Sequence, residues 1–209
     1  MVSTKLLSKI NTGENKRDIH YFLLEPFLPR ISKWVKKADD EKDVFDKYLA
    51  LFIATNMTYN LWAKVKNTER KELIFKDSQT FMDLRELIRN HEEFLQDINL
   101  KNLTDILHRD NLVVEIVRYN KQTKKYEIEG LAQNILTREN ISAERTTYYL
   151  WKTLYKIRCN LVHGEKGYED KQIRLLTCAS KILRKVLIKI LGEILTACDY
   201  RYDLPQEVV

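Results

Sequence analysis

The sequence predicts a mainly α-helical protein with one small β-hairpin inserted near residues 112–129. Only five glycines and three prolines occur in 209 residues, whereas folds rich in β-sheet need many turns. Apolar side chains recur at steps of three and four along several stretches, which is the spacing of an amphipathic helix. A chain of this length forms one large or two small domains, and it can bury a substantial core without disulfides or metal.

Residues 1–110 are expected to form a helical N-terminal part that packs on the rest of the chain. A short helix is expected at 20–24. Pro26 and Pro29 follow it and are expected to end it, because proline removes a backbone donor and clashes with the preceding turn.

A long helix is then predicted from the candidate N-caps Asp39 and Asp40 to about Lys66. Ser78 is expected to cap another helix, which continues through Leu95. The buried face of the long helix is expected to carry apolar side chains at helical spacing, namely Phe45, Tyr48, Leu49, Phe52, Tyr59 and Trp62.

A short helix at 103–107 is expected to lead into a β-hairpin insertion at 111–130. Its first strand, 112–119, is rich in β-branched residues, and its second, 126–129, ends at a glycine. The connecting loop carries three lysines, Lys121, Lys124 and Lys125. They are either a substrate or partner contact or an exposed charged turn, which is the commoner reason for lysines at a hairpin tip.

Two long helices are expected within residues 142–200. Ser142 is the candidate N-cap of the first helix. The buried seam of this helix is expected to consist of Leu150, Leu154, Ile157 and Leu161. The second helix is expected from about Asp170 to Cys198, with an apolar stripe wide enough to pack against two neighbours.

The most informative residues of the chain stand where the first of these helices runs out. They are Arg158, Asn160 and His163, followed by Gly164. Arginine binds phosphate as a permanent cation, histidine moves protons near neutral pH, and an asparagine amide can orient either group. Together, these side chains can bind and cleave a phosphodiester, which is ribonuclease chemistry.

The segment from Tyr155 to Gly164 resembles the signature of the HEPN family, in which four to six residues separate an arginine from a histidine and a polar residue closely follows the arginine. Here four residues separate Arg158 from His163, and Asn160 is the polar residue. The resemblance covers residues 142–200 and implies a HEPN-like antiparallel helical bundle. It also implies a metal-independent endoribonuclease, a toxin or anti-phage defence effector, whose active site lies at a homodimer interface.

In the mechanism that this resemblance implies, His163 takes the proton from a ribose 2′-hydroxyl, which attacks the adjacent phosphorus. Arg158 stabilises the charge that develops on the phosphate, and Asn160 orients the phosphate or His163. The implied partners are RNA, a second copy of the chain and an antitoxin or other regulatory protein, with no cofactor. Family members controlled by tyrosine nucleotidylation often carry a tyrosine two positions after the histidine. Glu165 stands there, which speaks against that form of control.

Helix geometry alone does not bring the motif side chains together. At about 100° per residue, Arg158 lies roughly 80° to one side of the buried seam, Asn160 roughly 80° to the other, and His163 about 140° from Arg158. Either the helix ends near His163, which Gly164 permits, or two subunits each contribute to one site.

The net charge of +6 is concentrated around the motif. Residues 142–201 contain twelve Lys and Arg against six Asp and Glu, while the remaining residues hold twenty-four of each. On the last helix four cations share one side and form a basic rail, Arg174, Lys181, Lys185 and Lys189. The basic rail either binds an RNA backbone or is a solvated face that needs no ligand.

Metal chemistry and membrane insertion are not expected. Cys159 and His163 have the spacing of two ligands on one helix face, but no third ligand is near in the sequence. No uncharged run of eighteen residues occurs, and the first residues do not resemble a signal peptide. Three widely spaced cysteines fit free thiols, so we expect a cytoplasmic protein.

Two other functions fit parts of the sequence. A catalytically silent HEPN-like module would bind a nucleotide, RNA or a partner protein. A structural helical adaptor would account for the amphipathic helices, but it would leave the grouping of Arg158, Asn160 and His163 to chance. Convergence of Arg158 and His163 in one cleft separates the enzyme from both alternatives.

Overall fold

The computed structural model describes residues 24–70, 87–88, 90–162 and 169–197. Within these ranges the protein is mainly helical, and its sheet is a single antiparallel pair of strands, which confirms the coarse prediction. None of the helices in these ranges is long and apolar enough to cross a membrane.

The first helix, α3 (Leu28–Asp40), begins where the sequence analysis expected a helix to end. Pro29 lies in its first turn, where a missing backbone N–H costs nothing because that group has no partner inside the helix. The buried side of α3 consists of Leu28, Ile31, Val35 and Ala38, at steps of three, four and three. Most of the short helix expected at 20–24 lies outside the described residues.

The second helix, α4 (Val44–Arg70), starts later than predicted. Its N-cap is Asp43, whose Oδ1 accepts hydrogen bonds of 2.8 and 3.1 Å from two backbone N–H groups of the first turn. The predicted caps Asp39 and Asp40 instead lie in the last turn of α3, a helix for which the sequence analysis made no prediction.

Two short helices follow, α6 (His91–Asp97) and α7 (Leu100–Arg109). Asn90 caps α6 and Asn99 caps α7, each by accepting a backbone hydrogen bond of 3.1 Å. The predicted helix from Ser78 therefore does not run unbroken to residue 95, because α6 starts anew at its own cap. Residue 78 itself lies outside the described residues. The predicted helix at 103–107 is confirmed as part of α7.

The predicted hairpin is confirmed as β1 (Glu115–Asn120) and β2 (Lys125–Leu131), which leads directly into α8 (Ala132–Leu136). A bulge interrupts the register and leaves Glu129 opposite no residue of β1. Gly130 beside the bulge has a φ of +151°, and a Cβ there would lie 3.4 Å from a side chain of α8. A glycine therefore suits this turn of the chain.

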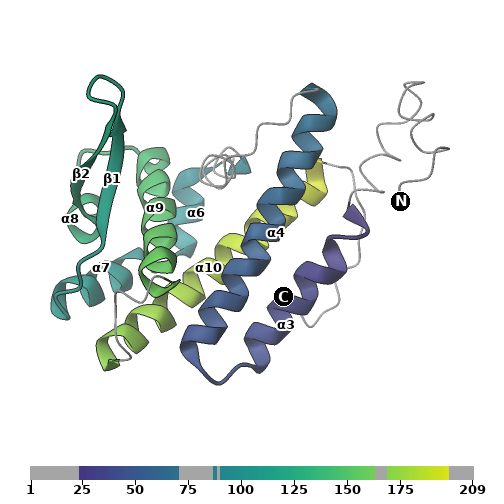
Figure 1. The fold of residues 1–209 in the computed structure, drawn as a ribbon, viewed down its shortest axis with the longest axis horizontal. Coiled ribbons are helices and arrows are strands. Elements are labelled where there is room, and N and C mark those ends of the chain that lie inside the picture. The colour runs from purple at the N-terminus through teal and green to yellow at the C-terminus, as the bar shows by residue number, and fades with distance from the viewer. Residues whose placement is uncertain (1–23, 71–86, 89, 163–168, 198–209) are drawn as a thin grey trace.

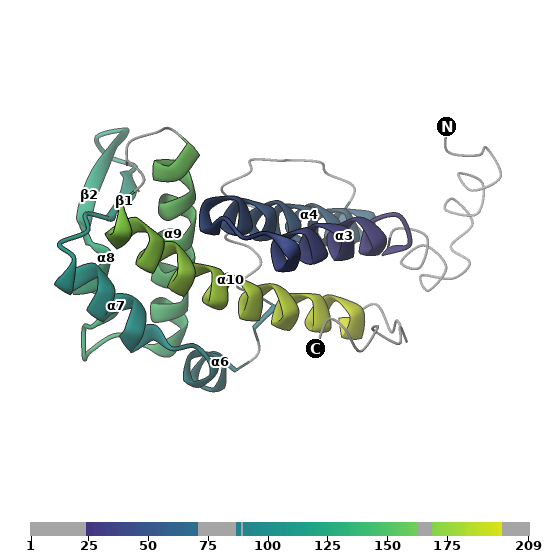
Figure 2. The same cartoon turned by 90° about the horizontal axis from the view of Figure 1, so that it is seen from below.

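The last two helices are α9 (Ala143–Val162) and α10 (Asp170–Ala197). Ser142 caps α9 as predicted, since its Oγ accepts a 3.3 Å hydrogen bond from a backbone N–H of the first turn. The predicted seam of α9 is buried or packed against the core. α10 lies along α4, whereas α9 crosses α10 near its start and stands beside α6, α8 and β1 (Figures 1 and 2).

Candidate functional site

Arg158 lies near the end of α9, partly buried beside α4. Its guanidinium carbon is 5.7 Å from the centroid of the Phe52 ring, which is a cation–π distance. The Phe52 ring centroid lies 6.3 Å from the ring centroids of Tyr48 and Tyr155. Arg158 forms no ion pair with the described residues, so none of their carboxylates competes with an anion for its hydrogen-bond donors.

The buried hydroxyl of Tyr48 fixes α9 relative to α4. It donates a 2.8 Å hydrogen bond to the backbone carbonyl of Leu154, one turn before Arg158. Burial raises the pKa of the Tyr48 phenol far above its usual range; the nearby Cys159 adds to the rise and Arg158 opposes it. Tyr48 therefore stays neutral and ties two helices together rather than accepting a proton.

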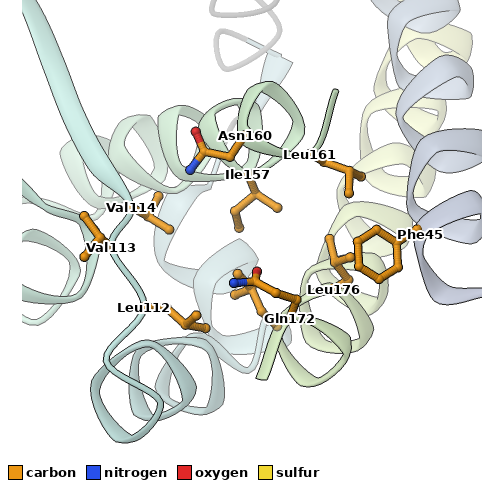
Figure 3. Close-up of a pocket in the computed structure, with 10 residues that line it drawn as sticks. Phe45, Leu112, Val113, Val114, Ile157, Asn160, Leu161, Gln172 and Leu176 are labelled. Atoms are coloured by element: carbon orange, nitrogen blue, oxygen red, sulfur yellow. The ribbon is translucent and has the colours of Figure 1, made fainter. Parts of the chain in front are cut away.

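Asn160 is buried, with only 6% of its surface exposed. It faces a small cavity between the end of α9, the start of α10 and the segment before β1 (Figure 3). The lining is mostly apolar, and Gln172 of α10 is the other polar side chain. The cavity volume of about 20 Å³ is enough for one water molecule. The Asn160 Oδ1 accepts no hydrogen bond from the described residues.

The structure therefore separates two residues that the sequence analysis grouped. Arg158 faces Phe52 of α4, whereas Asn160 faces the cavity at the start of α10. This placement agrees with their wide angular separation on an ideal helix. His163 and Gly164 lie outside the described residues, and the described part of α9 ends at the residue before them.

The first cation of the basic rail is exposed but already paired with a carboxylate of the protein. Arg174 forms a two-point ion pair with Asp110 at the end of α7, with N–O distances of 2.9 and 3.0 Å. The two hydrogen bonds lower the pKa of the Asp110 carboxyl and raise the pKa of the Arg174 guanidinium. Arg174 is thus paired with a carboxylate before any phosphate approaches.

Two further cations of the basic rail also have partners. Lys185 donates a hydrogen bond to the backbone carbonyl of Asp97 at the end of α6. The ammonium of Lys189 lies 3.7 Å from the carboxylate of Glu193, one turn along the same helix. Lys181 is exposed and makes no such contact with the described residues. Of the four cations, Lys181 is therefore the one that could bind an RNA phosphate without breaking a contact within the described residues.

A polar cluster that the sequence analysis missed joins the hairpin to the first half of α9. Tyr149 donates a hydrogen bond to Glu129 and accepts hydrogen bonds of 3.2 and 3.3 Å from Arg145. Lys152 donates a 2.8 Å hydrogen bond to a carbonyl of β1 and lies 3.8 Å from Glu129. Its ammonium also stands 4.7 Å from the centroid of the Tyr148 ring.

This cluster borders a surface pocket of about 470 Å³ between the hairpin and the start of α9. Burial, and then the hydrogen bond to Glu129, raise the pKa of Tyr149, and Arg145 opposes the rise. The four-residue spacing of Arg145 and Tyr149 was visible in the sequence. Their partner Glu129 could not be found that way, because it lies on another element, at the bulge of the hairpin.

Metal-binding residues do not gather within the described ranges: no three His, Cys, Asp or Glu side chains there could hold an ion. The chain has no match among protein family models, curated proteins or solved structures. Function therefore has to follow from the chemistry of the residues, among which Arg158 is a partly buried cation without a carboxylate partner in the described ranges.

Proposed function

We propose that this protein is a metal-independent endoribonuclease of the HEPN type, a toxin or anti-phage defence effector that acts as a homodimer. The observation that carries the proposal is the state of Arg158. It is partly buried, held by an aromatic ring, free of any ion pair with the described residues, and followed by His163 after four residues.

A partly buried arginine that pairs with no carboxylate of the described residues favours an anionic ligand. Burial takes water away from the guanidinium, and a cation–π contact returns only about 0.5–1 kcal/mol at an exposed site and about 2 when desolvated. A phosphate offers two parallel charge-assisted hydrogen bonds in the fork geometry of the guanidinium, which is a stronger and more specific contact. The ring of Phe52 then holds Arg158 in place before the phosphate binds.

The reaction follows from pairing this cation with a histidine. His163 takes the proton of a ribose 2′-hydroxyl, since histidine is the side chain that exchanges protons most readily near neutral pH. The 2′-oxygen attacks the adjacent phosphorus, and the 5′-oxygen of the next nucleotide leaves and gains a proton. The products are a 2′,3′-cyclic phosphate and a 5′-hydroxyl. Arg158 stabilises the extra negative charge on the five-coordinate phosphorus. DNA has no 2′-hydroxyl and is not cleaved.

The role proposed for Asn160 changes with its burial. A side chain that is 6% exposed and faces a cavity beside α10 has no surface for a phosphate on the Arg158 side of α9. We therefore assign the chemical steps to Arg158 and His163, and give Asn160 a positioning role at the junction of α9 and α10.

The dimer is proposed because one straight helix separates Arg158 from His163 by about 140°. A two-fold axis near the end of α9 would place two arginines and two histidines in one cleft, so that each phosphate meets residues from both chains. Such a cleft is also where an antitoxin or another regulatory protein could block access to RNA.

A catalytically silent HEPN-like module is the second candidate, and one observation favours it. Two cations of the basic rail, Arg174 and Lys189, are already paired with carboxylates of the protein, so the positive charge of the rail is reduced by half. A module of this kind would bind a nucleotide, RNA or a partner protein at Arg158 and would not turn over.

The test uses the purified full-length chain with an unstructured RNA, the matching DNA, and EDTA. RNA should be cut to fragments ending in 2′,3′-cyclic phosphate, and DNA should stay intact. His163→Ala should lower kcat by about 10²–10⁴ and spare RNA affinity, whereas Arg158→Ala should weaken both. Arg109→Ala is the control, because this arginine of α7 has a side chain that is 64% exposed.

Two outcomes would count against the enzyme. Cleavage that disappears in EDTA and returns with a divalent cation would remove the metal-independent mechanism. RNA binding that depends on Arg158, without any cleavage, would favour the silent module instead.

A further inference from the structure

The hairpin turns its apolar face toward solvent. The pairs of the register, Val117 with Ile128 and Tyr119 with Tyr126, place four side chains on one face. These side chains are 39%, 63%, 52% and 75% exposed in that order. The two tyrosine rings lie 5.2 Å apart between centroids and are tilted by 59°. We call these four residues the hairpin patch.

The opposite face of the hairpin carries polar side chains. Glu127 accepts a 2.7 Å hydrogen bond from Asn120 and lies 3.7 Å from Arg118. Arg118 and Glu129 border the pocket at the start of α9. A sheet with one solvated face normally turns its apolar side inward. The hairpin patch therefore does not serve the packing of the hairpin itself, and such exposed apolar surfaces mark sites of interaction.

Three free cations stand next to the hairpin patch. Lys121 and Lys124 in the turn, and Lys125 at the first position of β2, are exposed and contact no carboxylate of the described residues. The turn is ordered, since the Asn120 Oδ1 accepts backbone hydrogen bonds of 2.9 and 3.2 Å from within it. Glu127 accepts hydrogen bonds from Asn120 and Thr123 and lies 3.7 Å from Arg118, whereas Glu129 accepts a hydrogen bond from Tyr149 and lies 3.8 Å from Lys152. Neither carboxylate forms an ion pair with a lysine of the hairpin tip.

We propose that the hairpin patch binds single-stranded RNA, with bases stacked on Tyr119 and Tyr126 and the backbone held by the three lysines. Exposed aromatic rings offer a face to any unpaired base, and nearby lysines neutralise phosphates, which is how proteins hold single strands without strict sequence preference. The charge of the turn selects this occupant, because an apolar protein surface would leave the lysines without counterions. The choice of RNA rests on the proposed function.

The hairpin patch lies beside the first half of α9, where Lys152 donates a hydrogen bond to the backbone carbonyl of Val117, whereas Arg158 lies six residues further along the helix. The tip of the hairpin lies at the start of α9, and Arg158 lies near the other end of this 20-residue helix (Figure 1), which is about 30 Å long. A strand held at the hairpin must therefore extend along α9, or across the dimer, before it reaches the motif. The hairpin patch selects long single strands, whereas a dinucleotide can reach the motif without it.

The experiment measures binding apart from cleavage. Fluorescence anisotropy with a labelled, unstructured RNA is carried out on His163→Ala protein, so that the RNA stays intact. Tyr119→Ala with Tyr126→Ala should raise Kd about tenfold or more, because each stacked base contributes substantially to affinity. Phenylalanine at both positions should restore binding, and leucine should not. Ile188→Ala on α10 is the control, since Ile188 is also 39% exposed.

Salt dependence and strand state sharpen the test. Replacing Lys121, Lys124 and Lys125 by alanine should flatten the plot of log K against log salt by about two units, given a slope of about −0.7 per contacted phosphate of a single strand. The tyrosine variants should leave this slope unchanged. They should also leave the weaker binding of duplex RNA unchanged, because its bases are stacked within the helix.

Several results would overturn the inference. They are an unchanged Kd in the double alanine variant, full rescue by leucine, and a change of oligomeric state in place of RNA affinity, which would make the hairpin patch a protein interface. Failure of the two proposals is distinguishable. If RNA binding depends on the two tyrosines but wild-type protein does not cleave RNA, only the proposed ribonuclease activity is refuted. If wild-type protein cleaves RNA but binding does not depend on the tyrosines, only the RNA-binding role of the hairpin patch is refuted.

Discussion

Replacing Asn160 by leucine should stabilise the protein, although it removes a residue of the motif. The Asn160 side chain is 6% exposed, and its Oδ1 accepts no hydrogen bond from the described residues. A buried polar atom without a partner costs about 1–3 kcal/mol, because it has given up its hydrogen bonds to water. Leucine branches at Cγ as asparagine does, and its larger methyl groups extend into a cavity whose lining is already mostly apolar. The expected gain in the free energy of unfolding is therefore about 1–3 kcal/mol.

Urea unfolding followed by circular dichroism measures this gain. The midpoint should rise while the slope m, which reports the surface exposed on unfolding, stays constant. In a thermal melt the gain corresponds to roughly 2–4 °C for each kcal/mol. Gln133→Leu is the matched control, because Gln133 is also 6% exposed and has an Oε1 without a partner among the described residues, but lies on α8. A midpoint that falls for Asn160→Leu and rises for Gln133→Leu would refute the reasoning, since the Asn160 amide would then be hydrogen-bonded in solution.

Two further predictions concern the dimer and the basic rail. Mixing equal amounts of inactive Arg158→Ala and His163→Ala chains should restore about a quarter of wild-type cleavage, because half of the dimers are mixed and each mixed dimer keeps one of two shared sites; no recovery after verified subunit exchange would place both residues in one chain. Arg174→Ala should lower stability at neutral pH through loss of the pair with Asp110, whose carboxyl pKa is lowered in the folded state. Such a carboxylate stabilises the fold above its ordinary pKa of about 3.9 and ceases to do so as the pH falls through its lowered value. The stability difference between variant and wild type, measured by urea unfolding, should therefore shrink below about pH 4; a difference that persists at the lowest pH would show that packing, not charge, holds Arg174.

The parts of the fold that the sequence predicts well are those with a long, regular pattern. The apolar seam of α9 and the apolar stripe of α10 repeat over many turns. Both helices therefore start within a residue or two of their predicted first residues. The hairpin was likewise visible in its β-branched residues. α3 was missed because Pro29 was read as a helix end, although proline is equally at home in a first turn.

The candidate site was predictable only as far as a single helix determines it. The opposite directions of Arg158 and Asn160 follow from helix geometry. The burial of Asn160 depends on the start of α10 and the segment before β1, which no local pattern reveals. The basic rail looked free for the same reason, since the partner of Arg174 is Asp110, sixty-four positions away in the chain.

The hydrogen bond from Tyr48 to the carbonyl of Leu154 has a consequence for how the chain can be divided. In an α-helix the carbonyl of residue 154 also accepts a hydrogen bond from the backbone N–H of residue 158. The Tyr48 hydroxyl therefore binds the same carbonyl that the backbone of Arg158 binds. A rotation of α9 about its own axis would break this bond and leave the buried Tyr48 hydroxyl without a partner. The direction of the Arg158 guanidinium therefore depends on Tyr48, which lies 106 positions before Leu154 in the chain. Exchanging or shortening the N-terminal helices would therefore change the orientation of Arg158, even if every residue of the motif stayed the same.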